Sequence, residues 1–294
     1  MENLADESHG AKIVISGDTK ICGIIGYPVS HSASPRMHAA AYRSLGLNWA
    51  YVPFPVKPHE LESSIRGLQS LGIMGVNVTI PYKEAVIPYL HELSPAAARM
   101  GSVNTIVNRN GRLTGYSTDG QGFILSLERE ARISPKGQSA FLIGAGGAAR
   151  SIAFALVEAG VSELWISNRT RFRVDALKHD IEVAYPDAKV TTVDDRSIQM
   201  IHALEECKIV INTTPLGMPP NEDARPIEST QWVTSDHWVC DIIYKPFPTR
   251  WLADVQAKGA NILGGAGMLA GQGILAFHLF TGLEVAYDVM RREV

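Results

Sequence analysis

The stretch NVTIPYKE, residues 77–84, places a lysine beside polar residues in a segment that otherwise has the composition of a buried strand. Asn77 and Thr79 are two residues apart, so their side chains would point to the same face of that strand. Pro81 suits the first turn of a following helix, which would put Lys83 near the helix N-terminus. A cation there faces the positive end of the helix macrodipole, at a cost of about 0.3–1 kcal/mol. This unfavourable position predicts a function for Lys83, and a positioned lysine can donate a proton.

Other polar residues in the first half of the chain could complete a pocket around this lysine. In HSASP, Ser32 and Ser34 are two residues apart in a predicted extended segment, so their hydroxyls can point the same way. Ser34 could equally be the N-cap of the next helix. Asn104 begins a predicted strand, and Asp119 occupies a predicted N-cap position, where capping is the alternative role. One lysine, one acid and several uncharged donors indicate a pocket for a polyhydroxylated substrate.

A glycine-rich turn marks the second half of the chain. Residues 143–149, IGAGGAA, directly follow an apolar strand and open a helix, which is the context that a dinucleotide-binding turn requires. Gly144 would allow the tight turn, Gly146 would let the backbone approach a pyrophosphate, and Ala149 would permit close helix–sheet packing. The helix N-terminus would supply N–H donors to the anion. The pattern therefore predicts a nucleotide site here.

The end of the following strand indicates which nucleotide binds. Asn168, Arg169 and Thr170 stand where NAD-binding proteins usually carry an acid for the ribose diol, and Arg173 follows. Two guanidiniums and a hydroxyl suit a 2′-phosphate, because arginine offers a planar fork of donors. A solvated basic loop capped by Thr170 is the alternative interpretation. We predict NADP as the cofactor.

Composition excludes several classes of protein. The chain has 294 residues, 46% of them apolar and 19% charged, which is typical of globular proteins with room for two domains. A net charge of −3 predicts no nucleic-acid partner, and no apolar run is long enough for a membrane span. The first residues lack a signal-peptide pattern, so we expect a cytoplasmic protein. Three widely spaced cysteines fit reduced thiols better than disulfides or a metal site.

Strand and helix signals alternate, which predicts an α/β fold of two domains with parallel-type sheets and helices on both faces. The predicted strands are 20–26, 49–56, 75–79, 104–109, 163–168, 208–218, 238–244 and 260–265, and residues 140–160 are expected to form a strand, a turn and a helix. The predicted helices are 34–47, 58–71, 81–91, 117–131 and 170–179. We expect a substrate domain of residues 1–118, completed by helices in 267–294, and a Rossmann-type nucleotide domain of residues 119–266.

Nine segments resemble, in order and at about the same separations, those of shikimate dehydrogenases. They are SHSASP, NVTIPYKE, GSVNTI, STDGQG, GAGGAAR, NRTRFR, NTTPLGM, YKPFPT and GMLAGQG, and they extend over most of the chain. Members of that family are NADP-dependent enzymes that reversibly reduce 3-dehydroshikimate to shikimate in aromatic amino-acid biosynthesis. Their active site is a cleft between a substrate domain and a Rossmann domain.

The resemblance implies roles for individual residues. Lys83 and Asp119 would be the catalytic pair. The carboxylate and hydroxyls of the substrate would contact Ser32, Ser34, Thr79, Asn104 and Gln272, with Asn77 beside them and Tyr244 reaching in from the nucleotide side. The cofactor would contact Gly144, Ala145, Gly146, Gly147, Ala148, Asn168, Arg169, Thr170, Arg173, Thr213 and Gly265. No metal is implied, and the protein would be a monomer or homodimer with a small-molecule substrate.

Three residues depart from the family pattern, and other functions stay open. Ser117 stands where the family usually has Asn, Lys245 where Asn commonly follows the tyrosine, and Gly264 where Asn or Asp usually precedes a glycine. A broad-specificity quinate/shikimate dehydrogenase is the main alternative. A Rossmann-type nucleotide sensor without turnover is disfavoured by the presence of both Lys83 and Asp119. The folate methylene dehydrogenases share the two-domain plan but do not explain the serines of SHSASP.

Overall fold

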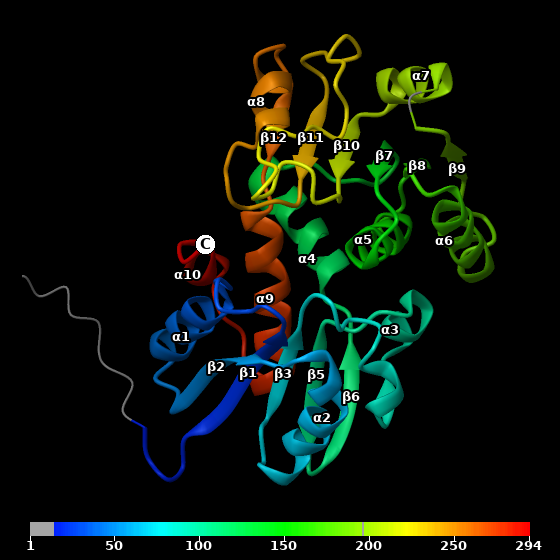
Figure 1. Ribbon diagram of the computed structural model, residues 1–294. Coiled ribbons are helices and arrows are strands. Elements are labelled where there is room, and N and C mark those ends of the chain that lie inside the picture. Colours follow the sequence, from blue (N-terminus) through cyan, green and yellow to red (C-terminus); the bar gives the residue numbers. More distant parts are fainter. Residues whose placement is uncertain (1–14, 196) are drawn as a thin grey trace, which may run out of the picture.

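The computed structural model describes residues 15–195 and 197–294 of the chain. Two separate six-stranded sheets form its two halves, one at the bottom and one at the top of Figure 1. Helices α4 (Asp119–Ser126) and α9 (Ala266–Thr281) run between the two sheets and pack against each other. The predicted two-domain α/β fold is therefore confirmed.

The sheet of the first half is mixed rather than wholly parallel. Its strand order is β2-β1-β3-β5-β6-β4. The strands are β1 (Lys20–Gly26), β2 (Trp49–Pro55), β3 (Gly75–Val78), β4 (Glu92–Leu93), β5 (Thr105–Arg109) and β6 (Arg112–Tyr116). The pairs β1–β2, β1–β3 and β4–β6 are parallel, whereas β5 is antiparallel to both β3 and β6. Sequence analysis missed β4 and β6.

A two-residue turn explains the antiparallel pair. Asn110 and Gly111 join β5 to β6 with φ values of 52° and 84°. Both residues of a type I′ hairpin turn need positive φ, and Asn-Gly is the preferred sequence for it. The predicted parallel-type sheet therefore includes antiparallel pairs at this edge, and the Asn-Gly dipeptide signalled the hairpin.

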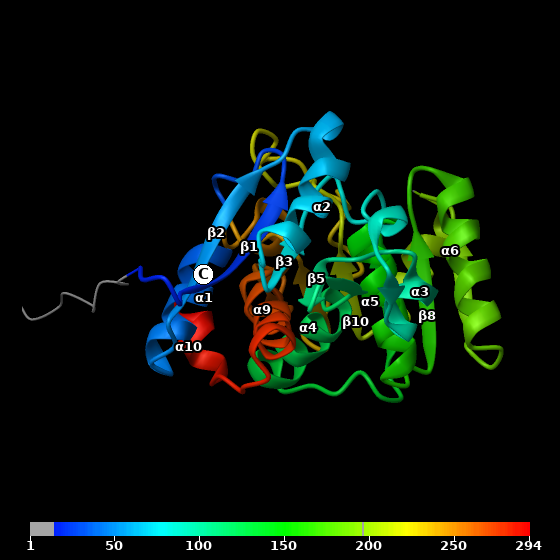
Figure 2. The same ribbon diagram turned by 90° about the horizontal axis from the view of Figure 1, so that it is seen from below.

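Helices cover both faces of this sheet, and the last helices of the chain belong to one of them. Figure 2 shows α2 (Leu61–Ser70) on one side and α1 (Ser34–Ser44), α9 and α10 (Tyr287–Arg291) on the other. One apolar cluster joins Met37 of α1 to Phe277 of α9 and Met290 of α10. The prediction that the C-terminal helices pack back on the first domain is confirmed. A short helix, α3 (Pro95–Met100), lies between this half and the second.

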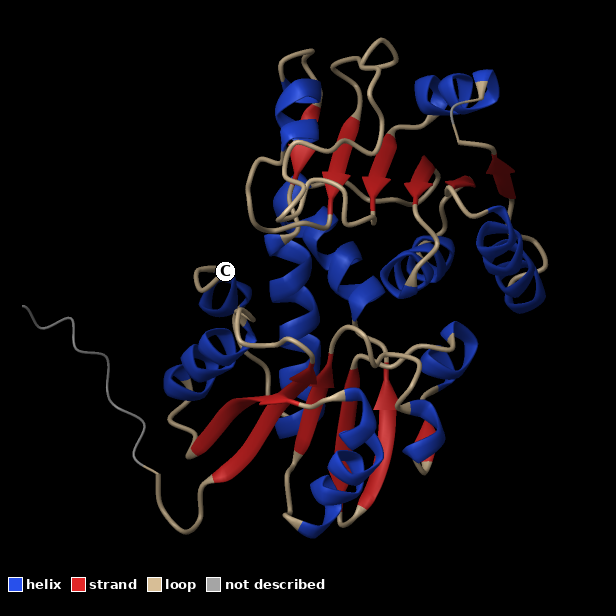
Figure 3. Cartoon of the chain, viewed as in Figure 1, coloured by secondary structure: helices blue, strands red, loops and turns tan. Residues whose placement is uncertain are grey.

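The second sheet is entirely parallel, with the order β12-β11-β10-β7-β8-β9. The strands are β7 (Ser139–Ile143), β8 (Glu163–Ser167), β9 (Val190–Val193), β10 (Ile209–Asn212), β11 (Trp238–Asp241) and β12 (Asn261–Leu263). The helices are α5 (Gly147–Glu158), α6 (Arg171–Ala184), α7 (Ile198–Glu206) and α8 (Arg250–Gln256), and Figure 3 shows them around the strands. Sequence analysis missed β9 and α7. The strand order reverses between β7 and β10, and ligands bind at such a switch point in parallel sheets.

The segment after β3 is not the predicted helix 81–91. Residues 81–86 form turns, and only a 3₁₀ turn, η2 (Ile87–Tyr89), follows. The Lys83 carbonyl accepts a hydrogen bond from the distant Val103 N–H at 2.8 Å. Pro88 has no N–H to donate to the carbonyl of residue 84. The macrodipole argument for Lys83 is therefore wrong, because no helix begins there.

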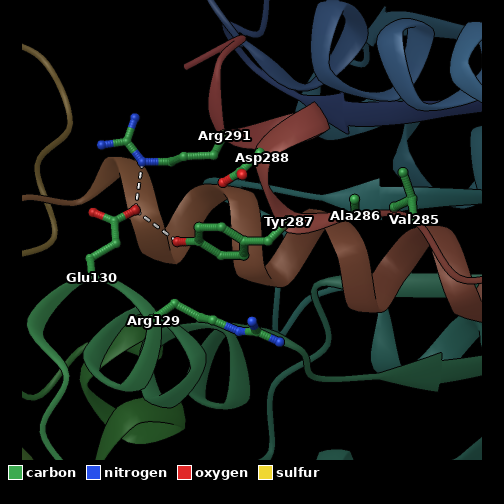
Figure 4. Close-up of a pocket in the computed structure, with 7 residues that line it drawn as sticks. All are labelled: Arg129, Glu130, Val285, Ala286, Tyr287, Asp288 and Arg291. Carbon is green, nitrogen blue, oxygen red and sulfur yellow. Dashed lines mark hydrogen bonds and ion pairs between the residues drawn. The ribbon is translucent and has the colours of Figure 1, made fainter.

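Glu130, in the segment that follows α4, forms polar contacts with residues of α10 near the C-terminus. Helix α4 continues into a π-helical turn, η3 (Leu127–Ala131), which carries Glu130. Glu130 Oε1 accepts hydrogen bonds from the Tyr287 hydroxyl at 2.8 Å and from Arg291 Nε at 2.6 Å (Figure 4). A Cβ on Gly267 would lie 2.7 Å from the same oxygen, so only glycine fits there. A surface cavity of about 740 Å³ opens beside these side chains, away from the predicted site.

Candidate functional site

Lys83 and Asp119 meet where the two halves face each other. Lys83 Nζ lies 2.5 Å from Asp119 Oδ2 and donates a hydrogen bond to it. The lysine side chain is 21% exposed and that of the aspartate 8%, so the pair is shielded but open to a ligand. Thr118, not Asp119, is the N-cap of α4, and Asp119 makes no capping bond. The capping alternative for Asp119 is therefore wrong.

Asn104 holds the second oxygen of this carboxylate. Its Nδ2 donates to Asp119 Oδ1 at 2.8 Å and approaches Gln272 Oε1 at 3.5 Å. Its Oδ1 accepts the backbone N–H of Thr118 at 2.8 Å. Asn104 is 2% exposed and Gln272 7% exposed, so both amide side chains are buried. Gln272 comes from α9, because this helix returns to the first half of the chain.

Asn77 is bound mainly to the protein itself. Its Oδ1 accepts the Tyr51 hydroxyl at 2.6 Å, and its Nδ2 donates to Asn104 O at 3.3 Å and to Thr105 Oγ1 at 3.0 Å. Both amide hydrogens are therefore used, which leaves one lone pair of Oδ1 for a ligand. Sequence analysis missed Tyr51 and Thr105, because a tyrosine and a threonine in strands are also typical of plain sheet packing.

Two of the remaining predicted substrate residues, Ser32 and Ser34, lie at the N-terminal end of α1. Ser34 is the first residue of α1, after the N-cap Ala33, so its proposed capping role is wrong. Its N–H donates to Ser32 Oγ at 3.2 Å. Burial raises the pKa of Tyr51 well above its ordinary value, and a hydrogen bond with the Ser34 hydroxyl acts in the opposite direction. Ser34 is itself buried, with 3% of its surface exposed.

Ser32, Thr79 and Tyr244 are half-buried. In the part of the chain that the structure describes, their side chains make no hydrogen bond to Lys83, Asp119, Asn104, Asn77 or Gln272. Two of the three lie on the substrate half, and Tyr244 lies beyond β11 on the nucleotide half. Hydrogen bonds therefore join the side chains of Lys83, Asp119, Asn104 and Gln272, with Asn77 bonded to the Asn104 carbonyl, and they do not include these three residues.

The glycine turn has the geometry expected for a nucleotide. Gly144, after β7, has φ +118°, and a Cβ there would lie 2.3 Å from Thr213 Oγ1. Thr213 follows β10 and donates its hydroxyl to Ile143 O at 2.7 Å. Gly146 is the N-cap of α5, and a Cβ on it would meet no atom within 4 Å, so its surface is open to a ligand. Ala149 is fully buried and packs α5 on the sheet.

Other predicted cofactor residues lie at the N-termini of two helices, α5 and α9. Ala145, Gly147 and Ala148 are half-buried beside the N-terminus of α5. Gly265, the N-cap of α9, packs so closely that a Cβ would lie 2.0 Å from Ile242 O. Free N–H groups at a helix N-terminus attract anions. The arrangement fits a dinucleotide, which when bound would be held by this turn.

The arginines after β8 differ in their partners. Arg171 pairs with Asp175 at 3.0 Å and with Asp194 at 2.6 Å. Arg169 and Arg173 are exposed, and neither has an ion pair or hydrogen-bonding side chain among residues 15–195 and 197–294. These two guanidiniums are available for a phosphate.

The polar residues beside them do not form the predicted cap. Thr170 is the N-cap of α6, but its side chain makes no capping bond. Asn168 Nδ2 donates to Thr170 O at 3.2 Å. The alternative of a loop capped by the Thr170 hydroxyl is therefore wrong.

A second buried carboxylate, which sequence analysis missed, ends β11. Asp241 is 2% exposed and accepts hydrogen bonds from Asn212 Nδ2 at 3.1 Å, the Thr249 hydroxyl at 2.9 Å and the Ile243 N–H at 3.1 Å. Burial raises the pKa of Asp241 to about 6, although these hydrogen bonds oppose the shift. Its donors fix the loops after β10 and β11 at the edge where a nucleotide would lie.

Comparison with known proteins places this site in a family. A family model described as the shikimate dehydrogenase substrate binding domain matches residues 24–106. Models described as shikimate/quinate 5-dehydrogenase and as the shikimate 5′-dehydrogenase C-terminal domain match residues 127–218 and 265–294. The shikimate dehydrogenase (NADP(+)) of Desulforamulus reducens is 46% identical over 94% of this chain and 95% of its own. The chain belongs to the shikimate dehydrogenase family.

Solved structures agree with this assignment. A shikimate 5-dehydrogenase of Thermus thermophilus, in complex with NADP(H) and shikimate, has a TM-score of 0.83 at 36% identity, over 93% of this chain and 98% of its own. A quinate dehydrogenase of Corynebacterium glutamicum, in complex with NAD, has a TM-score of 0.86 at 34% identity, over 94% of this chain and 98% of its own. The predicted class, an NADP-dependent oxidoreductase, is confirmed by the family.

Two further observations concern the predicted absences. None of the helices in the described residues is long and apolar enough to cross a membrane. The described residues also contain no group of three or more His, Cys, Asp and Glu side chains placed to hold a metal ion. All three cysteines are buried free thiols, and burial raises the pKa of Cys22 to about 12.

Proposed function

We propose that this protein catalyses the reversible, NADPH-dependent reduction of 3-dehydroshikimate to shikimate, as in aromatic amino-acid biosynthesis. The observation that carries the proposal is the Lys83–Asp119 pair, whose Nζ and Oδ2 atoms are 2.5 Å apart. The bonded set of Asn104, Gln272 and Asn77 around it supports a substrate with several oxygen atoms.

The proposed chemistry assigns one proton transfer to Lys83. NADPH, when bound, supplies a hydride to the ketone carbon. Lys83 stabilises the negative charge that develops on the substrate oxygen and donates a proton from Nζ to it. Asp119 orients the lysine through Oδ2 and hydrogen-bonds the substrate, while Asn104 fixes Oδ1 at 2.8 Å. In the oxidative direction Lys83 accepts the proton of the hydroxyl.

The proposed substrate contacts come from both halves. Ser32, Ser34 and Thr79 offer small hydroxyls for the carboxylate and ring hydroxyls of shikimate, with Asn104 and Gln272 from the buried network. Tyr244 would reach the substrate from the nucleotide half. Changing both serines to alanine should mainly raise KM if they bind ground and transition states alike. A normal KM in that double variant would remove the serines from the site.

The proposed cofactor site consists of the turn at Gly144–Ala148 with Thr213 and Gly265, and the loop at Asn168–Thr170 with Arg173. The unpaired guanidiniums of Arg169 and Arg173 support binding of a 2′-phosphate. We therefore propose that NADP is preferred to NAD.

Quinate is the second candidate substrate, because the Corynebacterium glutamicum relative is a quinate dehydrogenase. That protein is in complex with NAD, whereas Arg169 and Arg173, which have no side-chain partner among the described residues of this chain, favour NADP. Turnover of shikimate and quinate with NADP and NAD, followed by absorbance of the reduced cofactor, decides between them. Shikimate with NADP should have the highest kcat/KM. Higher kcat/KM for quinate with NAD would replace the proposal, and no turnover would favour a nucleotide sensor.

Three further predictions accompany this function. We propose a cytoplasmic location and a monomer or homodimer. The domain limits stay as predicted, with a substrate domain of residues 1–118 completed by 267–294 and a nucleotide domain of residues 119–266. Limited proteolysis and sedimentation of the full chain would test the limits and the oligomeric state.

A further inference from the structure

The N-terminus of α4 and the first turns of α5 are in close backbone contact. A Cβ on Gly120 would lie 2.0 Å from Ser151 O, so any larger residue would force the two helices apart. Asp119 is the neighbour of Gly120, and Ser151 lies on the helix that opens at the glycine turn. The predicted catalytic acid and the predicted cofactor turn are therefore carried by two helices that touch.

Two serines link the segment just before α4 to α5. Ser117 Oγ lies 3.1 Å from Ser151 Oγ, and Ser151 Oγ donates to Gly147 O at 3.1 Å. A hydroxyl has one proton to donate, so the proton of Ser151 goes to Gly147 and Ser117 must donate to the Ser151 oxygen. Ser151 is fully buried. Both hydrogen bonds of this bridge are therefore donated in the same direction, from Ser117 to Ser151 and from Ser151 to Gly147.

The two ends of the bridge belong to different parts of the site. Gly147 is the first residue of α5, at the proposed pyrophosphate contact. Ser117 is two residues before Asp119, and the intervening Thr118 bonds to Asn104 and to Gln272 O. Within the described residues, the Ser117–Ser151 bond is the only side-chain hydrogen bond from segment 117–119 to α5.

We propose that Ser117 and Ser151 are positioning residues that couple occupancy of the cofactor turn to the position of Asp119. A cofactor phosphate that accepts hydrogen bonds from N–H groups at the α5 N-terminus restricts the position of Gly147. Through the two serine hydrogen bonds, this restriction also acts on the segment that carries the Asp119 carboxylate. This inference rests on the proposed function, since it assigns a role in the same site.

The test measures coupling without turnover. Shikimate and NADPH are both reduced, so they form a ternary complex that cannot react. The affinity for shikimate is measured with and without saturating NADPH in the parent, Ser117→Ala, Ser151→Ala and the double variant. The ratio of the two affinities should fall about two- to tenfold in each single variant, the range of one neutral hydrogen bond. The double variant should show no further fall, because both changes break the same bridge.

Matched controls separate coupling from plain packing. Ser126→Ala removes a buried hydroxyl of α4 that donates only to Phe123 O of its own helix, at 2.7 Å, and the ratio should stay at the parent value. Ser117→Thr keeps the hydroxyl and should restore the ratio. In turnover, Ser117→Ala should lower kcat about two- to tenfold with little change in KM for shikimate. A parent-like ratio in Ser151→Ala, or an equal loss in Ser126→Ala, would overturn the proposal.

Hydrogen exchange distinguishes failure of this inference from failure of the proposed function. NADPH alone should slow amide exchange in residues 117–122 of the parent and of Ser126→Ala, but not of Ser151→Ala. This readout needs no shikimate and no reaction. A parent that shows the effect without turning over shikimate would refute the function and keep the bridge. Equal protection in the parent and in Ser151→Ala would refute the bridge whatever the activity.

Discussion

Two buried carboxylates lie in different regions near the site, one at the start of α4 between the sheets and one at the end of β11, and they differ in their partners. Asp119 receives hydrogen bonds from Lys83 Nζ at 2.5 Å and from Asn104 Nδ2 at 2.8 Å. Asp241 of the second half receives them only from neutral groups, those of Asn212, Thr249 and the Ile243 backbone. The first carboxylate therefore has a cation that can exchange a proton, whereas the second has only structural donors.

The difference shows how similar residues take different roles. Asn104 and Asn212 are both buried, and each holds an aspartate oxygen. With no cation to offset its desolvation, Asp241 has a pKa raised to about 6. The added lysine is what makes the Asp119–Asn104 arrangement, but not the Asp241–Asn212 arrangement, a candidate for proton transfer.

Removing the cation should have the largest effect. Lys83→Ala would leave Asp119 with neutral donors, as in Asp241, and should lower kcat by roughly 10²–10⁴, the contribution of a positioned acid or base. The KM for shikimate should change little, and NADP binding should persist because Lys83 lies on the other half. Asp119→Asn should also lower kcat, and the double variant should be much less than additive. Steady-state turnover of folded Lys83→Ala within a few-fold of the parent would contradict the assignment.

The pH dependence of the unfolding free energy should show the raised pKa of Asp241. Its pKa is about 6 in the folded protein against an ordinary 3.8, so the folded state binds the proton more tightly than the unfolded state. The contribution of this group to stability is greatest below pH 4 and is lost as the pH rises from about 4 to 6. The total is about 3 kcal/mol, from two units of pKa.

Urea unfolding between pH 4 and 7 measures this contribution. Asp241→Asn should remove the loss, so that the difference in unfolding free energy between variant and parent changes across this window. Asp187→Asn, at an exposed carboxylate, should keep the pH profile of the parent. Parallel profiles of the parent and Asp241→Asn would show that Asp241 does not titrate there.

The arginines extend the comparison to the cofactor. Arg169→Ala or Arg173→Ala should weaken NADP binding by about 1.5–3 kcal/mol and leave NAD binding nearly unchanged, on the scale of hydrogen bonds to charged groups. Arg171→Ala is the matched control, because that guanidinium already pairs with Asp175 and Asp194. Titration of each variant with both nucleotides gives the answer. Equal use of NADP and NAD by the parent would defeat the argument.

Two tyrosines of one apolar cluster, Tyr42 and Tyr51, test the hydrogen bonds around Asn77, where the smallest effect is expected. Tyr51→Phe deprives the buried Asn77 Oδ1 of its donor and should destabilise the protein by about 1–3 kcal/mol. Tyr42 packs in the same cluster, but its hydroxyl has no nitrogen or oxygen partner in the described structure. Tyr42→Phe should therefore change the unfolding free energy by much less. Similar losses in urea unfolding would mean that packing, not the hydrogen bond, explains Tyr51.

Local patterns predicted the elements that depend on neighbouring residues. The strand–turn–helix at the glycine motif was predicted because glycine conformation and apolar periodicity are local properties. The hairpin at Asn110–Gly111 was equally local and was overlooked. The helix predicted over 81–91 does not form, because Pro88 lacks an N–H donor and because the Lys83 carbonyl bonds to Val103, a partner that no local pattern indicates.

Residue types and their order along the chain suffice to predict two α/β halves, a nucleotide turn, and a lysine and an aspartate that resemble a catalytic pair. Which residues meet depends on the tertiary structure. Lys83 and Asp119 are 36 residues apart, and Asn104 approaches Gln272 across 168 residues. Tyr51 reaches Asn77 because β2 and β3 flank β1 in the same sheet. Such contacts depend on strand order and on the return of α9, which arise from burial of apolar surface over the whole chain rather than from any short motif.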